Sequence, residues 1–181
     1  MLLRRLYKQM KKMKDEFANE FQEFWNQTAG KVRAYMFCVC ENSADADDMA
    51  QDCCLRALRA WNQFNGSASR QAWLFGIARR TRVDWLRKEM RQNTTANLQK
   101  LEQYSKIVSE DSKIDNVNKV WQAVKDLSTE YSEVIHLRFA AGLSYSQIAH
   151  TLEIPIGTVR SRLHRGLKAI KENVGDRENE L

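Results

Sequence analysis

Apolar side chains recur at steps of three and four along most of the chain, with polar and charged side chains between them. This is the period of an α-helix that buries one face, whereas the strict alternation of a half-buried strand is absent. Early sets with this spacing are Phe17, Phe21, Phe24 and Trp25, and then Val32, Tyr35, Met36 and Val39. The pattern predicts an all-α protein in which the aromatic stripe lies in the core.

The clearest pair of helices is predicted between Gly142 and Lys171. Gly142 can end a preceding helix, because glycine adopts the left-handed cap without strain. Ser144 and Gln147 have the capping-box spacing, so a short helix should follow. That helix must end before Pro155, and proline is favoured at the first position of the next helix. Two helices joined by a tight turn are typical of a helix-turn-helix.

The second helix of this pair has an apolar face and a basic face. The apolar residues are Ile156, Val159, Leu163, Leu167 and Ile170. The basic residues are Arg160, Arg162, Arg165, Lys168 and Lys171, and no acid interrupts them. Small side chains at its start (Gly157, Thr158 and Ser161) would let the backbone approach a DNA groove. These features favour a DNA-reading helix over the alternative, an amphipathic hairpin whose basic face is merely solvated.

Composition shifts divide the chain into two helical units. Residues 1–14 form a basic N-terminal extension, residues 15–92 a first helical domain and residues 117–175 a second. Residues 93–116 are polar with few apolar anchors and are predicted to be a flexible linker, and residues 176–181 a C-terminal tail. We therefore expect two small helical domains, of which the C-terminal one is the helix-turn-helix.

Residues 41–52 hold five acids and no base, which is an abrupt reversal in a basic protein. Ser43 is predicted to cap a helix there, and Asp45 and Asp47 suit its first turn because of the helix dipole. That explanation fails for Asp48, Gln51 and Asp52. Their spacing of three and four places them on one helical face, which offers two carboxylates and an amide to a basic partner.

Residues 61–70 are predicted to form a loop, followed by a helix rich in arginine. Two aromatic residues, Trp61 and Phe64, flank polar residues in the loop. This suits a pocket for an unstacked base, and it equally suits an ordinary loop with two hydrophobic anchors. The helix that follows carries six bases against two acids, as expected of a helix that tracks a nucleic-acid backbone.

Composition narrows the class of protein. The 181 residues carry a net charge of +6, which favours a polyanionic partner such as nucleic acid. No apolar run is long enough to cross a bilayer and no signal peptide is visible, so we expect a cytoplasmic protein without direct membrane insertion. The four cysteines (Cys38, Cys40, Cys53 and Cys54) lack metal-ligand spacing and are expected to be buried reduced thiols. No cofactor and no catalytic set are expected.

Three stretches, in order, resemble the extracytoplasmic-function (ECF) group of the bacterial sigma-70 family. Residues 45–52 (Asp-Ala-Asp-Asp-Met-Ala-Gln-Asp) are similar to region 2.2. Residues 73–80 (Trp-Leu-Phe-Gly-Ile-Ala-Arg-Arg), with Asp-Trp-Leu-Arg-Lys from Asp84, are similar to regions 2.3 and 2.4. Residues 154–166 are similar to region 4.2. The resemblance spans residues 17–174 and places region 2 in 15–92 and region 4 in 117–175.

The resemblance implies a promoter-specificity subunit of RNA polymerase that is not an enzyme. It implies docking on the β′ clamp and β flap of core polymerase, binding to promoter DNA, and control by an anti-sigma factor that is often membrane-bound in this group. Residues implied to bind core polymerase are Asp48, Gln51 and Asp52. Residues expected at the −10 element are Trp61, Phe64, Asn65, Ser67, Arg70, Arg79, Arg80, Arg82, Arg87 and Lys88. Residues expected at the −35 element are Ser144, Thr158, Arg160, Ser161, Arg162, His164, Arg165 and Lys168.

Two departures from the family pattern qualify this expectation. Asp52 stands where the family often has Glu, which keeps the charge but shortens its reach. The aromatic pair that housekeeping members use for promoter melting is missing near Phe75 and Gly76, which implies weak melting. The main alternative function is a stand-alone helix-turn-helix regulator that binds operator DNA. A nucleic-acid enzyme and a protein adaptor are further alternatives.

Overall fold

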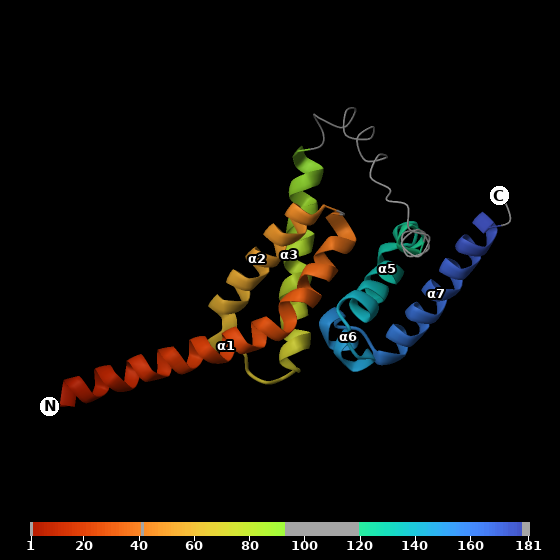
Figure 1. Ribbon diagram of the computed structural model, residues 1–181. Helices are drawn as coiled ribbons and strands as arrows, with labels where there is room; N and C mark the ends of the chain where they lie inside the picture. Colours follow the sequence, from red (N-terminus) through yellow and green to blue (C-terminus); the bar gives the residue numbers. More distant parts are fainter. Residues whose placement is uncertain (1, 41, 93–119, 179–181) are drawn as a thin grey trace.

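The computed structural model describes the backbone of residues 2–40, 42–92 and 120–178, and the side chains of residues 17–40, 42–91 and 120–174. The N-terminal helices are α1 (Leu2–Cys40), α2 (Ser43–Ala60), the short 3₁₀ helix η1 (Trp61–Gln63) and α3 (Arg70–Gln92). The C-terminal helices are a short helical segment at residues 120–125, α5 (Thr129–Ile135), η3 (His136–Ala140), α6 (Tyr145–Leu152) and α7 (Ile156–Glu178). The described part is all-α and contains no strand (Figure 1).

The predicted boundaries need some adjustment. α1 runs without a break through residue 14, where the sequence suggested the end of a separate extension, and α7 runs three residues into the predicted tail. The predicted linker, residues 93–116, lies outside the described residues.

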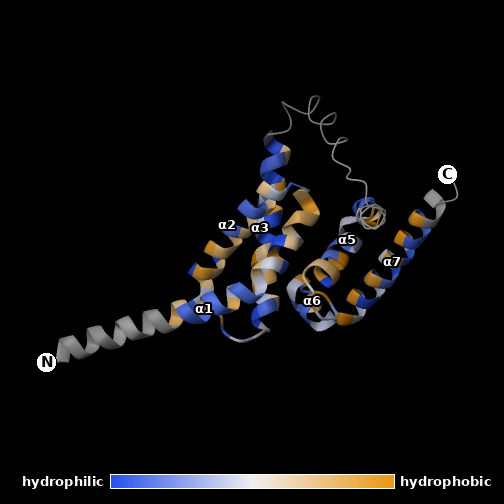
Figure 2. Cartoon of the chain, viewed as in Figure 1, coloured by the Kyte–Doolittle hydropathy of each residue, from blue (hydrophilic) through white to orange (hydrophobic). Residues whose placement is uncertain are grey.

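α1, α2 and α3 pack along one another because each buries the apolar face that its sequence period predicts. Figure 2 shows hydrophobic and hydrophilic residues alternating around these helices. α2 begins one position earlier than predicted: Asn42, and not Ser43, is its N-cap, with the Asn42 side chain accepting from the Ala44 amide. Ser43 instead accepts a bond from Arg33 of α1 (2.6 Å). Arg33 also donates to Asp47, so α1 fixes the start of α2 by side-chain contacts.

The helix-turn-helix forms as predicted, with two local differences. The capping box of Ser144 and Gln147 is complete, and Gly142 has the left-handed φ of +69°. Glu153 also adopts a left-handed conformation (φ 55°) and ends α6, which no sequence signal indicated. Pro155 lies just before α7 and not inside it, since its carbonyl accepts from the amides of Thr158 and Val159.

Gly166 allows α7 to pack tightly against α5. It is buried, and a Cβ built on it would lie 2.8 Å from Cδ1 of Ile135 and 3.4 Å from Cβ of Tyr131. Because Gly166 has no side chain, α7 and α5 can approach each other closely at this point.

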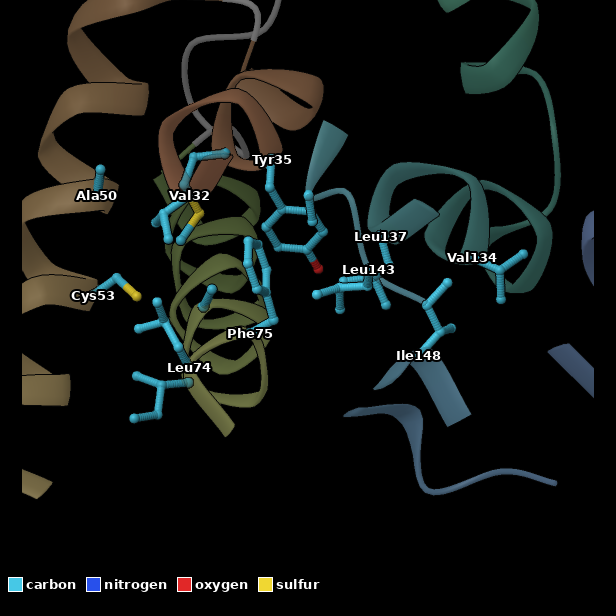
Figure 3. Packing of buried hydrophobic residues seen from close by; sticks show 14 of the residues in the cluster. Val32, Tyr35, Ala50, Cys53, Leu74, Phe75, Val134, Leu137, Leu143 and Ile148 are labelled. Atoms are coloured by element: carbon cyan, nitrogen blue, oxygen red, sulfur yellow. The ribbon is translucent and has the colours of Figure 1, made fainter. Parts of the chain in front are cut away.

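The two predicted domains share one hydrophobic core. Tyr35 of α1 and Phe75 of α3 meet edge to face with ring centroids 5.6 Å apart. Figure 3 shows these rings beside Leu137, Leu143 and Ile148 from the C-terminal helices, and all five side chains are fully buried. The two predicted helical domains are therefore present, and they pack on each other.

Candidate nucleic-acid and protein-binding surfaces

The outer face of α2 combines polar and apolar side chains. Asp48 and Gln51 are exposed, as the sequence predicts for a docking face. Leu55 and Leu58 continue the same face and are 50% and 39% exposed. Sequence reasoning missed these two leucines because their spacing also fits a buried stripe. Exposed apolar residues beside acids are typical of a protein-docking surface.

Asp52 differs from the other two predicted docking residues. Its carboxylate lies 2.9 Å from Nη2 of Arg56, one turn further along α2. Arg56 also pairs with Asp84 of α3 at 2.7 Å. The side-chain hydrogen bond that Arg56 donates to Asp84 is the largest cause that raises the Arg56 pKa. Asp52 is thus part of a bridge between α2 and α3, although half of it is exposed.

The loop before α3 contains one half-buried aromatic ring, that of Phe64, and one buried aromatic ring, that of Trp61. Phe64 is half-buried and its ring centroid lies 5.6 Å from that of Trp73. Trp61 is only 6% exposed and packs edge to face on Phe21 at 5.3 Å. The Trp61 ring is already covered on the inside of the fold, which favours the alternative in which it is a hydrophobic anchor of the loop.

Polar residues of the same loop are exposed. The Asn65 side chain accepts a bond from the Ser67 amide (3.0 Å), and Gly66 between them has φ +74°. Arg70 lies over the Trp61 ring, with its guanidinium carbon 4.8 Å from the centroid, and pairs with Glu20 of α1. Asn65, Ser67 and part of Phe64 are therefore open to solvent, and the contacts of Arg70 hold the loop in place.

The basic residues of α3 divide between two sides of the helix. Arg80, Arg87 and Lys88 are exposed. A hollow of about 470 Å³ lies between α2 and α3 on this side, and its charged lining residues are Arg56, Arg79, Arg80, Asp84 and Arg87. With four cations against one carboxylate, the hollow is suited to a phosphate backbone.

Arg79 and Arg82 both contact the C-terminal helices, although Arg79 also lines the hollow. Nε of Arg79 donates to Glu133 of α5 at 2.7 Å. Arg82 is 9% exposed, and its Nη1 lies 3.3 Å from Nδ1 of His136. Arg82 is therefore covered in this arrangement, contrary to the sequence-based expectation, whereas the Arg79 side chain remains 42% exposed.

α7 presents most of its predicted residues to solvent. Arg160, Ser161, His164, Arg165 and Lys168 are exposed, and Thr158 is partly exposed. Arg162 is the exception, since its Nη2 lies 2.7 Å from the Glu130 carboxylate of α5. The Arg162 side chain is 26% exposed, and its ion pair with Glu130 fixes α7 against α5. Ser144, at the start of α6, is exposed, but its hydroxyl accepts the Gln147 amide in the capping box.

All four cysteines were predicted to be buried, and the structure shows that their burial differs. Cys53 is buried, and burial raises its pKa to about 12. Cys38, Cys40 and Cys54 are half-buried, and burial raises the pKa of Cys38 to about 11. Within the described residues no group of His, Cys, Asp or Glu side chains could hold a metal ion. None of the described helices is long and apolar enough to span a membrane.

The fold and these surfaces define a helical protein with a helix-turn-helix, a second basic surface and an acidic–apolar docking face. Residues 24–92 match sigma-70 region 2, and residues 118–170 match sigma-70 region 4. These are the two segments in which the sequence motifs lie.

Proteins of similar sequence carry the same two regions. The ECF RNA polymerase sigma factor SigW of Bacillus subtilis (strain 168) is 30% identical over 97% of this chain and 98% of its own. The ECF RNA polymerase sigma-E factor of Escherichia coli (strain K12) is 29% identical over 73% of this chain and 75% of its own.

Two solved structures have a similar fold. The sigma factor RpoE of Bartonella quintana, in complex with the anti-sigma factor NepR, gives a TM-score of 0.71. It is 24% identical, and the match covers 86% of this chain and 97% of RpoE. CnrH, in complex with the cytosolic domain of CnrY, gives a TM-score of 0.64 at 20% identity over 88% of this chain and 90% of CnrH.

The chain therefore belongs to the sigma-70 family, in its group of ECF RNA polymerase sigma factors. It is a promoter-specificity subunit, which binds core RNA polymerase and promoter DNA and directs the initiation of transcription.

Proposed function

We propose that each surface described above has a separate task in the polymerase–promoter complex. The observation that carries the proposal is the separation of charge: α2 exposes acids and leucines, whereas α3 and α7 expose arginines. Opposite charges on different faces let one chain bind a protein on one side and a nucleic acid on the others.

The α2 face would dock on the β′ clamp of core polymerase. Asp48 and Gln51 supply a carboxylate and an amide, and Leu55 and Leu58 supply apolar area that water must leave on docking. Asp52 contributes charge from its edge of the face while Arg56 holds its carboxylate. The β flap is the second expected contact on polymerase, made by the C-terminal unit.

The loop and the exposed side of α3 would bind the −10 element. Phe64, Asn65 and Ser67 lie where an unstacked base could meet a ring and two polar groups. Arg80, Arg87 and Lys88 are suited to the adjoining phosphates. Arg70 keeps the loop in place through its contacts with Trp61 and Glu20, so its role there is to position the loop.

The α7 helix would enter the major groove at the −35 element. Thr158 and Ser161 lie at its N-terminal end, where recognition helices contact base edges. Arg160 and Arg165 are exposed and can bond guanine or phosphate, and His164 and Lys168 extend the same surface.

An anti-sigma factor is the expected regulator. The structures of RpoE and CnrH contain NepR and the cytosolic domain of CnrY, respectively. Because this chain has the same fold, an anti-sigma factor that covers its polymerase- and DNA-binding faces would hold it inactive. The chain would act in the cytoplasm, as a transcription initiation factor and not as an enzyme.

Run-off transcription with core RNA polymerase tests the proposal. We expect promoter-specific transcripts only when the chain and core polymerase are both present, and weak binding of the chain alone to the same promoter. Tight promoter binding without polymerase, together with no transcript, would instead support a stand-alone helix-turn-helix regulator.

A further inference from the structure

The hollow between α2 and α3 has a mixed lining, of which a phosphate backbone alone would use only a part. α2 and α3 lie side by side (Figure 1), and the hollow between them measures about 470 Å³. That volume lies within the range of small-molecule sites, roughly 300–1,000 Å³. The lining combines aliphatic side chains, available cations and a carboxylate. Each of these suits a different part of one class of ligand.

The aliphatic part of the lining comes from both helices. Ile77 of α3 is buried, and Val83 of α3 and Ala60 of α2 are half-buried. The flat face of a nucleobase can cover such side chains, so that apolar area on both sides is removed from water. A bare phosphate would leave this part of the hollow in contact with water.

The guanidinium groups of the hollow are not equally available to an anion. Arg56 and Arg79 each lie within 2.9 Å of at least one carboxylate. Arg80 and Arg87 are exposed, and Arg80 forms no ion pair with another described residue. These two arginines are two helical turns apart, which is about 10 Å along the axis of α3. At that spacing they can bind different phosphates of one polyphosphate chain.

Asp84 supplies the carboxylate of the hollow. Its Oδ2 accepts from Nη1 of Arg56 at 2.7 Å, which joins α3 to α2. Its Oδ1 lies 3.9 Å from Nη1 of Arg87, which is too far for a hydrogen bond. Because the Asp84 side chain is 50% exposed, Oδ1 can accept a hydrogen bond from a ligand. A carboxylate repels phosphates, but it is a suitable acceptor for ribose hydroxyls, as in dinucleotide-binding folds.

The carboxylate favours a free ribonucleotide over a DNA strand. DNA has no 2′-hydroxyl, and the 3′-oxygens within a strand are esterified, so its sugars have no hydroxyl to donate to Asp84. A free ribonucleoside polyphosphate has a base for the aliphatic side chains, ribose hydroxyls for Asp84 and a phosphate chain for Arg80 and Arg87. Such a ligand uses every part of the lining.

We propose that the hollow between α2 and α3 binds a free ribonucleoside polyphosphate, with its phosphates on Arg80 and Arg87 and its ribose on Asp84. The nucleotide occupies two guanidiniums that are assigned above to the phosphates of the −10 element, so nucleotide and promoter compete for them. This competition rests on the proposed function, whereas the binding of the nucleotide does not. The site makes use of the promoter dependent on the concentration of ribonucleotides.

The test measures binding to the full chain by isothermal titration calorimetry, without DNA or polymerase. The probes are ATP, 2′-deoxy-ATP and inorganic tripolyphosphate. Arg80→Ala removes one of the two available cations, and Lys88→Ala is the matched control, because it removes the same charge from an exposed position of α3 outside the hollow. Asp84→Ala removes the acceptor for the ribose. Asp84→Asn, which keeps an oxygen for Arg56, replaces it if the alanine variant does not fold.

We expect the parent chain to bind ATP roughly tenfold more tightly than 2′-deoxy-ATP, as a hydrogen bond to a charged group would give. ATP should also bind more tightly than tripolyphosphate, which has no base. Arg80→Ala should weaken ATP binding roughly tenfold, because a charge-assisted bond is lost. Lys88→Ala should keep the parental affinity. In the Asp84 variant, ATP and 2′-deoxy-ATP should bind with nearly equal affinity.

Four results would overturn the proposal. The first is that the parent chain does not bind ATP. The second is equal affinity of the parent for ATP and 2′-deoxy-ATP, which would mean that Asp84 does not bind the ribose. The third is equal affinity for ATP and tripolyphosphate, which would mean that the hollow binds any polyanion. The fourth is an equal loss in Arg80→Ala and Lys88→Ala, which would mean that net charge explains the binding.

Run-off transcription by the parent chain is a separate readout. The calorimetry contains neither DNA nor polymerase, so a failure of transcription would reject the proposed function and leave the measured affinity for ATP as it stands.

Discussion

Glu130 of α5 holds Arg162 of α7, with its carboxylate 2.7 Å from Nη2 of the guanidinium. The basic residues of α7 therefore have two different roles. Arg162 is directed back towards the protein, whereas Arg160 and Arg165 are exposed. Gly166 has no side chain, so α5 can approach α7 closely. This close contact and the Glu130–Arg162 pair together fix α7 against α5.

Because Arg162 contacts the protein whereas Arg160 is exposed, substitutions of these two arginines should have different effects. Arg160→Ala should weaken promoter binding by the polymerase complex and reduce the salt slope by about 0.9, because one phosphate is no longer neutralised. Arg162→Ala should instead lower the free energy of unfolding by about 0.2–1 kcal/mol, as for other partly exposed pairs, with an unchanged slope. Denaturant unfolding and salt-dependent promoter binding would measure both. An equal loss of slope in the two variants would place Arg162 on the DNA.

Reversing the charge of Asp48 should abolish binding to core polymerase. Asp48 is exposed and forms no ion pair with another described residue, so Asp48→Lys should keep the parental circular dichroism and melting temperature. Leu55→Asp should have the same effect, because a charge would then have to be desolvated in the docked face. Co-purification with core polymerase measures both, with the exposed Glu23→Lys on α1 as control. Normal co-purification of Asp48→Lys would remove α2 from the polymerase interface.

The two aromatic residues of the loop should respond differently to alanine. Trp61→Ala should cost about 3–5 kcal/mol of stability, the usual range for a large aromatic in a core. Phe64→Ala should cost much less, because Phe64 is half-buried, but should weaken binding of a single-stranded −10 probe to the polymerase complex. Thermal unfolding separates the two residues. Parental probe binding by Phe64→Ala would argue against a base pocket in this loop.

Acid should destabilise the folded chain through His136. Burial, with a further contribution from the charge of Arg82, lowers its pKa from 6.5 to about 3. Arg82 is the charged group that faces it, and Trp121 covers the ring. The unfolded chain therefore binds a proton below pH 6.5 that the folded chain excludes, so the stability from a neutral His136 is lost as the pH falls from 6.5 towards 3.

The slope of this loss should approach about 1.4 kcal/mol per pH unit, in addition to the contribution of the carboxylates. His136→Gln keeps a polar side chain at the position without a titrating group. Urea unfolding at several pH values should therefore give a shallower pH dependence for the variant. Parallel curves for the two proteins would show that His136 does not contribute.

The sequence by itself determined the elements and their local chemistry. The period of its apolar residues specifies helices, and Ser144, Gln147, Gly142 and Pro155 mark where helices start and stop, because capping and backbone sterics act over a few residues. The acidic face of α2 and the basic faces of α3 and α7 are likewise periodic, so their existence could be predicted. A step of three or four does not say which of two apolar faces is buried, and so the burial of Trp61 and the exposure of Leu55 and Leu58 could not be predicted.

Only the tertiary structure decided the partners of the charged side chains. Arg79, Arg82 and Arg162 look like their exposed neighbours in sequence, yet each meets a residue of α5 or η3 that is far away along the chain. Such pairs depend on how the two units pack, and no local pattern encodes that. The same packing joins Tyr35 and Phe75 to the C-terminal core and holds the two predicted domains against each other, because burying apolar area stabilises the contact without directional signals in the sequence.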